Sequence, residues 1–348
     1  MINALTDFSQ NRYMTYPHCN GFCSGGRFLV LGQIEHEATS LWRVDLALGE
    51  ERLISRFLPS QSPSAPLWFD VAYEAARLVT VVDNAVWIYD LEGKNEPLCV
   101  YQASGEDILC GMPSISSDGR RVLAGVRDAD SYFGLIITVE SRQVVEPIRH
   151  SWWANHMHFC PHDENWIGYC HEGKAETLSD RVWAWHADEA PVGRCIFDQK
   201  SQTPGVHLCV GHERWCFHDN AALVPAYAIG SAGPYGLYQV FTDGRPPRFV
   251  SAGDRDWHCD ISRDGKWAVV DTSGPHDLPG KSWENSGGIS DVLLINMVTG
   301  QRRFLARSRM TNPHPSHPHP VFSPDGRRVF YNEANEQGTQ NRIMQVLL

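Results

Sequence analysis

The segment Val321-Phe-Ser-Pro-Asp-Gly-Arg-Arg-Val-Phe-Tyr331 decides the fold, because it joins two short apolar strands through a tight Asp-Gly turn. The same strand-turn-strand unit recurs along the chain, so that seven copies can be read. The copies occupy residues 21–31, 68–81, 114–124, 158–169, 215–226, 260–270 and 321–331. A unit that recurs in this way indicates a repeat architecture, in which neighbouring units bury each other's apolar faces.

A further strand with alternating polarity follows each copy, for example at residues 41–46, 85–93 (with its turn) and 134–139, so every unit is built of β-strands alone. Equivalent residues of successive copies are 47, 46, 44, 57, 45 and 61 positions apart. This spacing is close to the period of a four-stranded propeller blade. The sequence therefore predicts an all-β protein, a seven-bladed β-propeller with four-stranded blades, as a single domain over residues 1–348.

The two ends of the chain are expected to meet in the last blade. The chain ends at Leu348, just after the third strand of that blade. We therefore predict that a strand within residues 7–16 supplies its outermost strand and closes the ring, which leaves no unpaired edge. The two long spacings predict insertions around residues 187–210 and 273–316, and long loops on a rigid scaffold often carry function.

Composition narrows the choice of partners and compartment. The 348 residues are 42% hydrophobic and carry a net charge of −11, with no basic run, which argues against a nucleic-acid partner. No leader-like N-terminus and no apolar stretch of about 18 residues is present, so we expect a cytoplasmic protein without a membrane partner. The ten scattered cysteines favour reduced thiols over a zinc or disulfide scaffold. The sequence leaves the oligomeric state open.

The densest chemical signal is the segment Asn312-Pro-His-Pro-Ser-His-Pro-His-Pro320, which holds His314, His317 and His319 just before the first strand of the last blade. Residues two apart on an extended chain face the same side, and proline stiffens the backbone between them. Imidazoles in this arrangement suit a divalent first-row metal, and His258, ahead of the first strand of blade six, is the best partner from another blade. The alternative is a stiff polar loop whose histidines only form hydrogen bonds.

Three further histidines lie near strand ends in adjacent blades: His156, His171 and His212. A neutral histidine beside a metal can accept a proton or contact a substrate. Taken singly, each histidine of this kind is more often a structural residue held by hydrogen bonds.

Arg181 begins an otherwise aromatic and apolar strand, Arg181-Val-Trp-Ala-Trp185. Either it forms a salt bridge with Glu172 or Asp180, or its guanidinium contacts a substrate. The chain has no GxSxG nucleophile elbow and no phosphate-binding loop, which disfavours serine-hydrolase and nucleotide chemistry.

Several motifs, taken in order, resemble the oligogalacturonate lyases, polysaccharide lyase family twenty-two, which are seven-bladed propellers. The motifs are Tyr169-Cys-His-Glu-Gly173, Asp180-Arg-Val-Trp183, Gly211-His-Glu-Arg-Trp215, the blade that begins at Asp260, and His317-Pro-His-Pro320. The Ser-Pro-Asp-Gly turn is common to many propellers. His-Pro-His-Pro together with Cys-His-Glu-Gly and His-Glu-x-Trp is the specific part of the likeness.

The resemblance implies roles for individual residues. It implies that His258, His317 and His319 bind a divalent ion of the Mn²⁺ type, that His212 is the catalytic base, and that Arg181 lies beside the base. Where the family has a glutamine ligand, three residues before the first histidine of His-Pro-His, this chain has His314, which is then the expected fourth ligand.

The implied activity is the cleavage of short uronate oligosaccharides by metal-assisted β-elimination, which leaves a 4,5-unsaturated uronate. The implied partner is thus an acidic oligosaccharide, and His156 and His171 are the candidates for binding it. Two alternatives stay open at this point: a non-catalytic propeller similar to TolB-type modules that binds a sugar or a protein, and a metal-dependent propeller hydrolase or lactonase.

Overall fold

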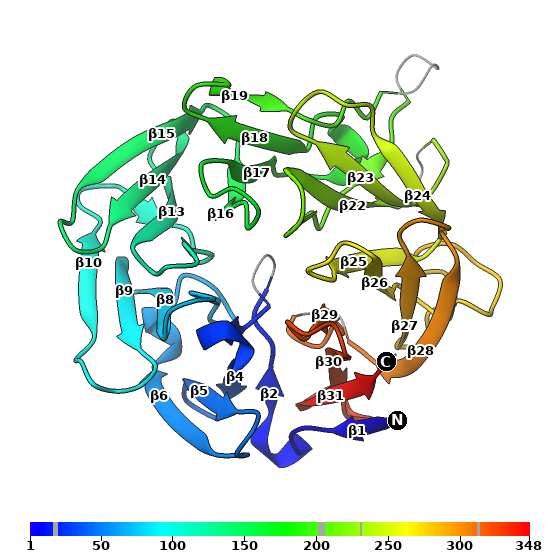
Figure 1. Cartoon of the computed structure of the whole chain (residues 1–348), viewed down its shortest axis with the longest axis horizontal. Coiled ribbons are helices and arrows are strands. Elements are labelled where there is room, and N and C mark those ends of the chain that lie inside the picture. Colours follow the sequence, from blue (N-terminus) through cyan, green and yellow to red (C-terminus); the bar gives the residue numbers. More distant parts are fainter. Residues whose placement is uncertain (17–19, 201–205, 230–231, 312–313) are drawn as a thin grey trace. The chain divides into compact units, whose positions relative to one another are not determined.

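The computed structural model describes residues 1–16, 20–200, 206–229, 232–311 and 314–348. In these residues the strands form seven antiparallel sheets that follow one another along the chain, and no α-helix is present (Figure 1). Four single turns of 3₁₀-helix connect strands: η1 (Phe8–Gln10), η2 (Ser24–Gly26), η3 (Pro59–Gln61) and η4 (Ala175–Thr177). The fold is a seven-bladed β-propeller, which confirms the class predicted from the repeat.

Two compact units can be distinguished, and each is described by itself. We call residues 10–172 with 185–193 the N-terminal unit, and residues 1–9 and 173–184 with 194–348 the C-terminal unit. The single-domain organisation over residues 1–348 stays a prediction. None of the helical turns in the described residues has the length and apolar character that a membrane crossing requires.

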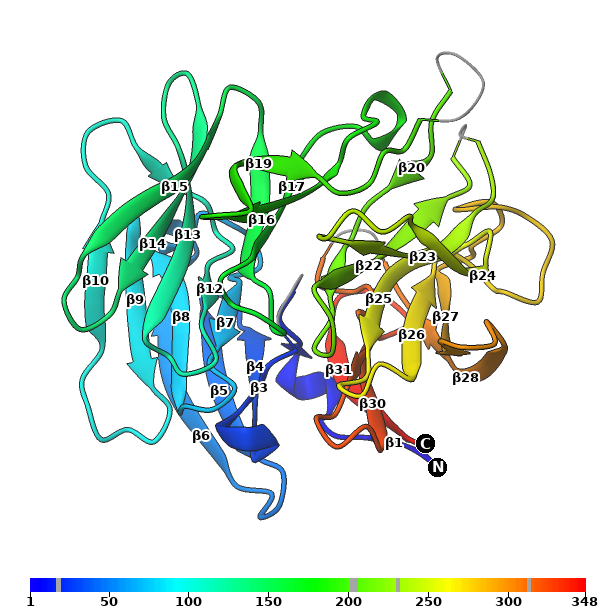
Figure 2. The same ribbon diagram turned by 45° about the horizontal axis from the view of Figure 1, so that its top comes forward.

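Three sheets belong wholly to the N-terminal unit, and in Figure 2 their strands run side by side. They contain β2 (Arg12–Tyr13), β3 (Phe22–Cys23), β4 (Phe28–Ile34), β5 (Thr39–Asp45), β6 (Glu51–Phe57), β7 (Phe69–Val71), β8 (Arg77–Val82), β9 (Ala85–Asp90), β10 (Leu98–Gln102), β11 (Ile108–Leu109), β12 (Ser114–Ile115), β13 (Arg121–Arg127), β14 (Tyr132–Thr138) and β15 (Val144–His150). The core between neighbouring sheets is aliphatic, as where Val79 and Val86 cluster with Val122 and Ala124. Alternating apolar residues thus face the neighbouring blade, as a propeller requires.

The fourth sheet contains β16 (Ala154–Phe159), β17 (Ile167–His171), β18 (Val182–His186) and β19 (Ala190–Cys195), in that order. The last three sheets belong to the C-terminal unit. They contain β20 (Cys209–Val210), β21 (Arg214–Trp215), β22 (Ala221–Tyr227), β23 (Gly236–Phe241), β24 (Arg248–Ala252), β25 (Asp256–Ile261), β26 (Trp267–Thr272), β27 (Ile289–Asn296), β28 (Arg302–Arg309), β29 (Val321–Phe322), β30 (Arg328–Ala334), β31 (Asn341–Leu347) and the N-terminal β1 (Ile2–Ala4).

Closure by an N-terminal strand is confirmed, but the predicted position of that strand, residues 7–16, is wrong. The closing strand is β1, which pairs with β31 so that Ile2 lies opposite Val346 (Figure 1). Residues 12 and 13 instead form β2, which pairs with β4. The reason is burial: the Tyr13 side chain is inaccessible and its hydroxyl donates to Leu67 O at 2.7 Å, whereas β1 is exposed along its length. β2 is thus a buried strand at one end of its sheet, whereas β1 is an exposed strand at the edge of the last blade.

The predicted insertions contain regular structure. Residues 273–316 include β27 and β28, so the extra length lies in the connections on either side of these strands. Residues 187–210 include β19 and β20, and residues 201–205 of that range lie outside the described part. The nine cysteines within the described residues form no disulfide, Cys19 lies outside those residues, and reduced thiols stay a prediction.

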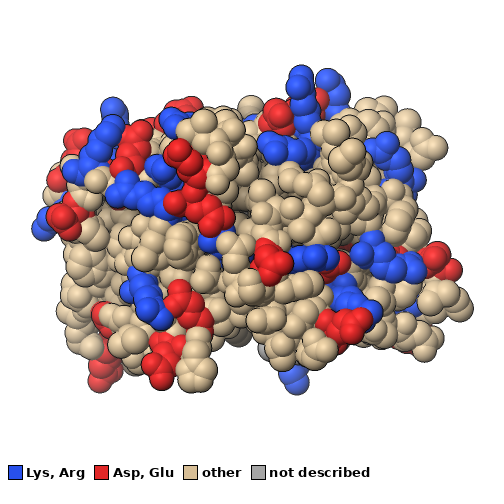
Figure 3. All heavy atoms as spheres, turned by 90° about the horizontal axis from the view of Figure 1, so that it is seen from below, with Lys and Arg blue, Asp and Glu red and all other residues tan. Residues whose placement is uncertain are grey.

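On the face of the molecule drawn in Figure 3, Lys and Arg side chains are interspersed with Asp and Glu side chains. Many charges in the described residues are paired, such as Arg245 with Asp219 at 2.9 Å and Arg149 with Glu146 at 2.6 Å. Interspersed positive and negative side chains are typical of a solvated protein surface. Exposed ion pairs on such a surface contribute little to the stability of the fold.

Candidate metal centre and proton acceptor

Three buried histidines of the C-terminal unit converge on one point. His258 lies in β25, while His317 and His319 lie in the segment that leads into β29. One ring nitrogen of each lies within 4.8 Å of those of the other two, and the residues are only 3–4% exposed. The ring centroid of His258 is 4.2 Å from that of His319 and 5.4 Å from that of His317. A single ion can be held between three donors at this spacing.

A bulge in β25 aims the His258 ring. Asp256 pairs with Thr272 and Cys259 with Val270, so Trp257 and His258 together lie opposite the single residue Asp271. The carboxylate of Asp271 accepts hydrogen bonds from the backbone N–H of His258 at 2.7 Å and from its Nδ1 at 2.8 Å. Because Nδ1 is engaged in this way, Nε2 is the nitrogen left to act as a ligand.

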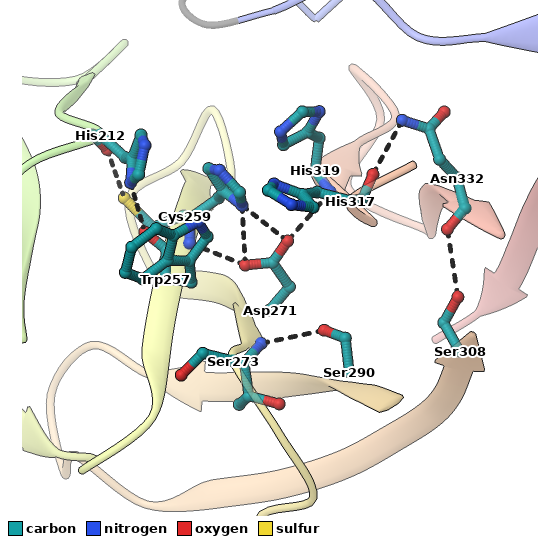
Figure 4. Close-up of polar contacts among 12 residues, drawn as sticks. His212, Trp257, Cys259, Asp271, Ser273, Ser290, Ser308, His317, His319 and Asn332 are labelled. Carbon is teal, nitrogen blue, oxygen red and sulfur yellow. Dashed lines mark hydrogen bonds and ion pairs between the residues drawn. The ribbon is translucent and has the colours of Figure 1, made fainter. Parts of the chain in front are cut away.

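Backbone contacts fix the other two histidines. Figure 4 shows Asp271 between β25 and the segment that carries His317 and His319. The backbone N–H of His319 donates to Asp271 Oδ2 at 3.1 Å, and Asn332 Nδ2 donates to the carbonyl oxygen of His317 at 3.0 Å. His319 has a φ of 44°, a left-handed conformation that a non-glycine residue adopts at some cost and that is concentrated at functional sites.

The electrostatics keep this cluster neutral. Burial lowers the pKa of His317 to about 4 and the pKa values of His258 and His319 well below their usual range. Burial also raises the pKa of Asp271 to about 7. At neutral pH the three imidazoles therefore keep the lone pairs that a metal ligand needs.

The residues fit a divalent ion. Neither ring nitrogen of His317 has a hydrogen-bond partner among the residues that the structure describes. A buried polar atom without a partner costs free energy, which coordination to an ion would offset. An all-imidazole donor set, oriented by a carboxylate behind one ring, is typical of first-row divalent metals.

His314, the predicted fourth ligand, lies next to the cluster. Its ring centroid is 4.8 Å from that of His317 and 5.0 Å from that of His319. It is not one of the three histidines whose ligand atoms lie within 4.8 Å of one another. Its role as a fourth ligand stays a prediction.

His212 lies in the break of the innermost strand between β20 and β21, with a left-handed φ of 54°. Its ring centroid is 4.3 Å from that of His258. Nδ1 lies 3.0 Å from Trp257 O and 2.5 Å from Tyr227 Oη. Because a carbonyl oxygen only accepts, we assign the proton to Nδ1, which leaves a lone pair on Nε2. His212 thus has the tautomer of a proton acceptor.

Arg181 lies next to Gly211, the residue that precedes His212. It is 5% exposed, and its Nε is 3.9 Å from Glu213 Oε2, an acid that neither salt-bridge alternative from the sequence had named. A Cβ atom added to Gly211 would lie 2.7 Å from Tyr227 Oη and 3.2 Å from Arg181 Nε. Only glycine therefore lets the two side chains approach this closely beside the base.

His156 and His171 belong to the N-terminal unit, whereas the other six predicted site residues belong to the C-terminal unit. His156 is 7% exposed, and its Nε2 lies 3.6 Å from Glu172 Oε2. The ring of His171 packs on Trp152, with centroids 4.3 Å apart. Their predicted role in substrate binding stays a prediction.

Sequence reasoning missed two residues that organise the site, Asp271 and Tyr227. The sequence contains a sign of the role of Asp271, because this charged residue follows directly on the apolar run of β26. Tyr227, at the end of β22, belongs to no motif, and only the fold brings its hydroxyl to His212.

Fold and site together define a β-propeller with a buried histidine centre suited to a metal. The chain is similar to the oligogalacturonate lyase of Dickeya dadantii strain 3937, with 23% identity over 202 residues, which are 56% of this chain and 50% of that protein. The chain thus matches about half the length of this curated relative. A solved oligogalacturonate lyase in complex with manganese has a TM-score of 0.81 and 17% identity, over 100% of this chain and 93% of that chain. These comparisons confirm the resemblance read from the sequence.

Other propellers are less similar. TolB from Acinetobacter baumannii has a TM-score of 0.50 at 13% identity, over 92% of this chain and 80% of that chain. At this level the likeness concerns the fold alone. No protein-family profile matches the chain.

Proposed function

We propose that the chain is a lyase that cleaves short uronate oligosaccharides, such as oligogalacturonates, by metal-assisted β-elimination. One observation carries the proposal: the buried trio of His258, His317 and His319 adjoins a histidine, His212, whose ring is 4.3 Å from that of His258. A metal site next to a proton acceptor suits removal of a proton alpha to a carboxylate. The names of the relatives supply the class of substrate.

The metal is proposed to be a divalent ion, and Mn²⁺ in particular by analogy with the manganese complex of the similar structure. His258, His317 and His319 would hold it, with His314 as the fourth ligand. When bound, the ion supplies positive charge that neutralises a uronate carboxylate and so makes the C5 proton more acidic.

The residues of the chain carry the proton transfer. Nε2 of His212 accepts the C5 proton, while Trp257 O and Tyr227 Oη hold Nδ1 and keep the ring in place. The electron pair of the C5–H bond forms the C4–C5 double bond as the C4–O bond breaks, and the leaving oxygen takes up a proton from water. Arg181, buried next to Gly211, offsets the negative charge that develops on the substrate.

The substrate is proposed to be an acidic oligosaccharide even though the chain carries a net charge of −11. The local field of a metal and a guanidinium decides binding, and the net charge does not. His156 and His171 are the proposed contacts from the N-terminal unit, and a cytoplasmic location stays a prediction.

Product analysis tests the proposal against its two alternatives. The wild-type chain with Mn²⁺ is incubated with di- and trigalacturonate and with oligomers of other uronates, and the absorbance of the 4,5-unsaturated uronate is followed. A lyase raises this absorbance. A hydrolase or lactonase yields products that lack the double bond, and a binding module similar to TolB leaves the oligomers intact. Either of these results would contradict the proposal.

A further inference from the structure

A second group of metal-type side chains belongs to the N-terminal unit, and it includes His156. His156, Cys170 and Glu172 each present one ligand atom, and these atoms lie within 4.8 Å of one another. Cys170 Sγ is 3.4 Å from Glu172 Oε2, and His156 Nε2 is 3.6 Å from the same oxygen. Three different donor types, an imidazole, a thiol and a carboxylate, thus meet in one place.

The backbone builds this group in two ways. Cys170 and Glu172 are two residues apart on an extended chain, so their side chains face the same side, and the Glu172 N–H donates to Trp153 O to continue the pairing of β16 with β17. On β16, Asn155 pairs with Cys170 and His158 with Gly168, so two residues bulge opposite one. His156 occupies this bulge with a φ of 54°. Bulges of this kind re-aim side chains at functional sites.

The His156–Cys170–Glu172 cluster is more buried than a group of charged side chains on the protein surface. Cys170 is inaccessible, His156 is 7% exposed, and the Glu172 side chain is 16% exposed. A thiolate, an imidazole and a carboxylate around one point are typical ligands of zinc, which prefers nitrogen and sulfur donors. The donor set is softer than the all-imidazole trio at His258.

We propose that His156, Cys170 and Glu172 form a second divalent-metal site, for an ion of the zinc class. Binding releases the proton of the Cys170 thiol, and the thiolate, Nε2 of His156 and a carboxylate oxygen of Glu172 become ligands. Three protein ligands leave room for at least one further ligand, such as water or an anionic group. The proposal gives His156 a ligand role in place of the substrate contact named above, and it does not depend on the chemistry proposed for His212.

A third cluster, His276, Asp277 and Asp291, does not support the same inference. The guanidinium of Arg307 lies 2.7 Å from Asp291 Oδ1 and 2.5 Å from Asp277 Oδ1. A cation therefore already neutralises both carboxylates, and an added metal ion would have to displace it.

Cobalt(II) replacement tests the second site. The metal-free protein is loaded with Co²⁺ alone, and the absorption spectrum is recorded with the number of bound ions per chain. A cobalt–thiolate bond gives an intense near-ultraviolet charge-transfer band, which imidazole ligands do not give. We expect this band in the wild-type chain. Cys170→Ser should lose the band and bind one cobalt ion fewer per chain. His319→Ala should keep the band, although it also binds one ion fewer, because it loses the ion of the histidine trio. Cys99→Ser, a partly buried cysteine on β10, is the matched control and keeps the band.

Either of two outcomes would overturn the inference. The first is the absence of a thiolate band in the folded, cobalt-loaded wild-type chain, and the second is a band that persists in Cys170→Ser. If Cys170→Ser does not fold, Glu172→Gln decides the question. It should keep the band and weaken the affinity for Co²⁺, followed at that band, by at least about tenfold, and unchanged affinity contradicts the role of Glu172. Because the readout is a spectrum, failure of the lyase assay does not affect it.

Discussion

The carboxylate of Asp271 accepts the Nδ1–H of His258 at 2.8 Å from within the same bulged strand pair. The same carboxylate accepts the backbone N–H of His319 at 3.1 Å. One buried acid on β26 therefore fixes residues from two different blades of the C-terminal unit. This relationship holds His258 in place relative to the segment of His317 and His319, which lies about sixty residues further along the chain, and so preorganises the donor set.

Replacing Asp271 with asparagine should weaken metal binding. An amide in place of the carboxylate can accept only through its single oxygen, so the orientation and basicity of the His258 ring are less well held. We expect the affinity for Mn²⁺, measured by calorimetry, to fall about 10- to 100-fold. Asp264→Asn, in an exposed turn of the same sheet, is the control and should bind as the wild type does. Unchanged affinity in Asp271→Asn would show that the carboxylate does not support the site.

Tyr227 should act as a positioning residue for His212. Tyr227→Phe removes the hydroxyl that lies 2.5 Å from Nδ1, while the contact of Nδ1 with Trp257 O remains. We expect kcat to fall by less than the roughly 10² that loss of the base itself would cost, with KM and metal content near the wild-type values. Tyr238→Phe is the control, because it removes a hydroxyl that donates to Pro234 O and not to His212. A change in KM or metal content alone would point to a structural role instead.

Gly211→Ala should disturb the base and Arg181 together. The added methyl group would lie 2.7 Å from Tyr227 Oη, so the neighbouring side chains must move. Because a displacement of about 1 Å can cost about 10² in rate, we expect kcat to fall on that scale while the fold is retained. Gly233→Ala, where the nearest atom to the new Cβ is 3.7 Å away, is the control. Wild-type kinetics in Gly211→Ala would mean that the close approach is not needed.

His150 should contribute to a loss of stability in mild acid. Burial, and secondarily the nearby His171, lowers the pKa of His150 to about 4, whereas an unfolded histidine titrates near 6.5. As the pH falls from about 6.5 to about 4, the unfolded chain takes up a proton that the folded chain does not, so the free energy of unfolding decreases.

His150→Phe removes this titration and keeps an aromatic ring to stack on Trp152. The difference in urea midpoint between about pH 7.5 and about pH 5, measured with a chelator present, should therefore be smaller in the variant than in the wild type. The variant can be less stable at both pH values, because Tyr169 loses a contact at 3.1 Å. An equal or larger difference in the variant would contradict the assignment.

The repeat made the fold predictable, because each blade restates the same strand-turn-strand pattern. The position of the closing strand was not predicted, since residues 2–4 carry no distinctive strand pattern and the burial of Tyr13, which goes with the pairing of β2 to β4, is a property of the fold. The histidine trio could be predicted, because His317 and His319 are two residues apart on a chain stiffened by proline, a spacing that indicates metal ligands. Tyr227 and the bulge at His258 could not, because their effect depends on register between strands and not on local sequence.

The most direct test of the account measures kcat and manganese content of His212→Ala on trigalacturonate. Nε2 of His212 is the proposed acceptor of the C5 proton, while the ligands His258, His317 and His319 remain in the variant. The account predicts a fall in kcat of at least about 10² at wild-type manganese content. If His212→Ala forms the unsaturated product at the wild-type rate, His212 is not the base and the proposed mechanism is wrong.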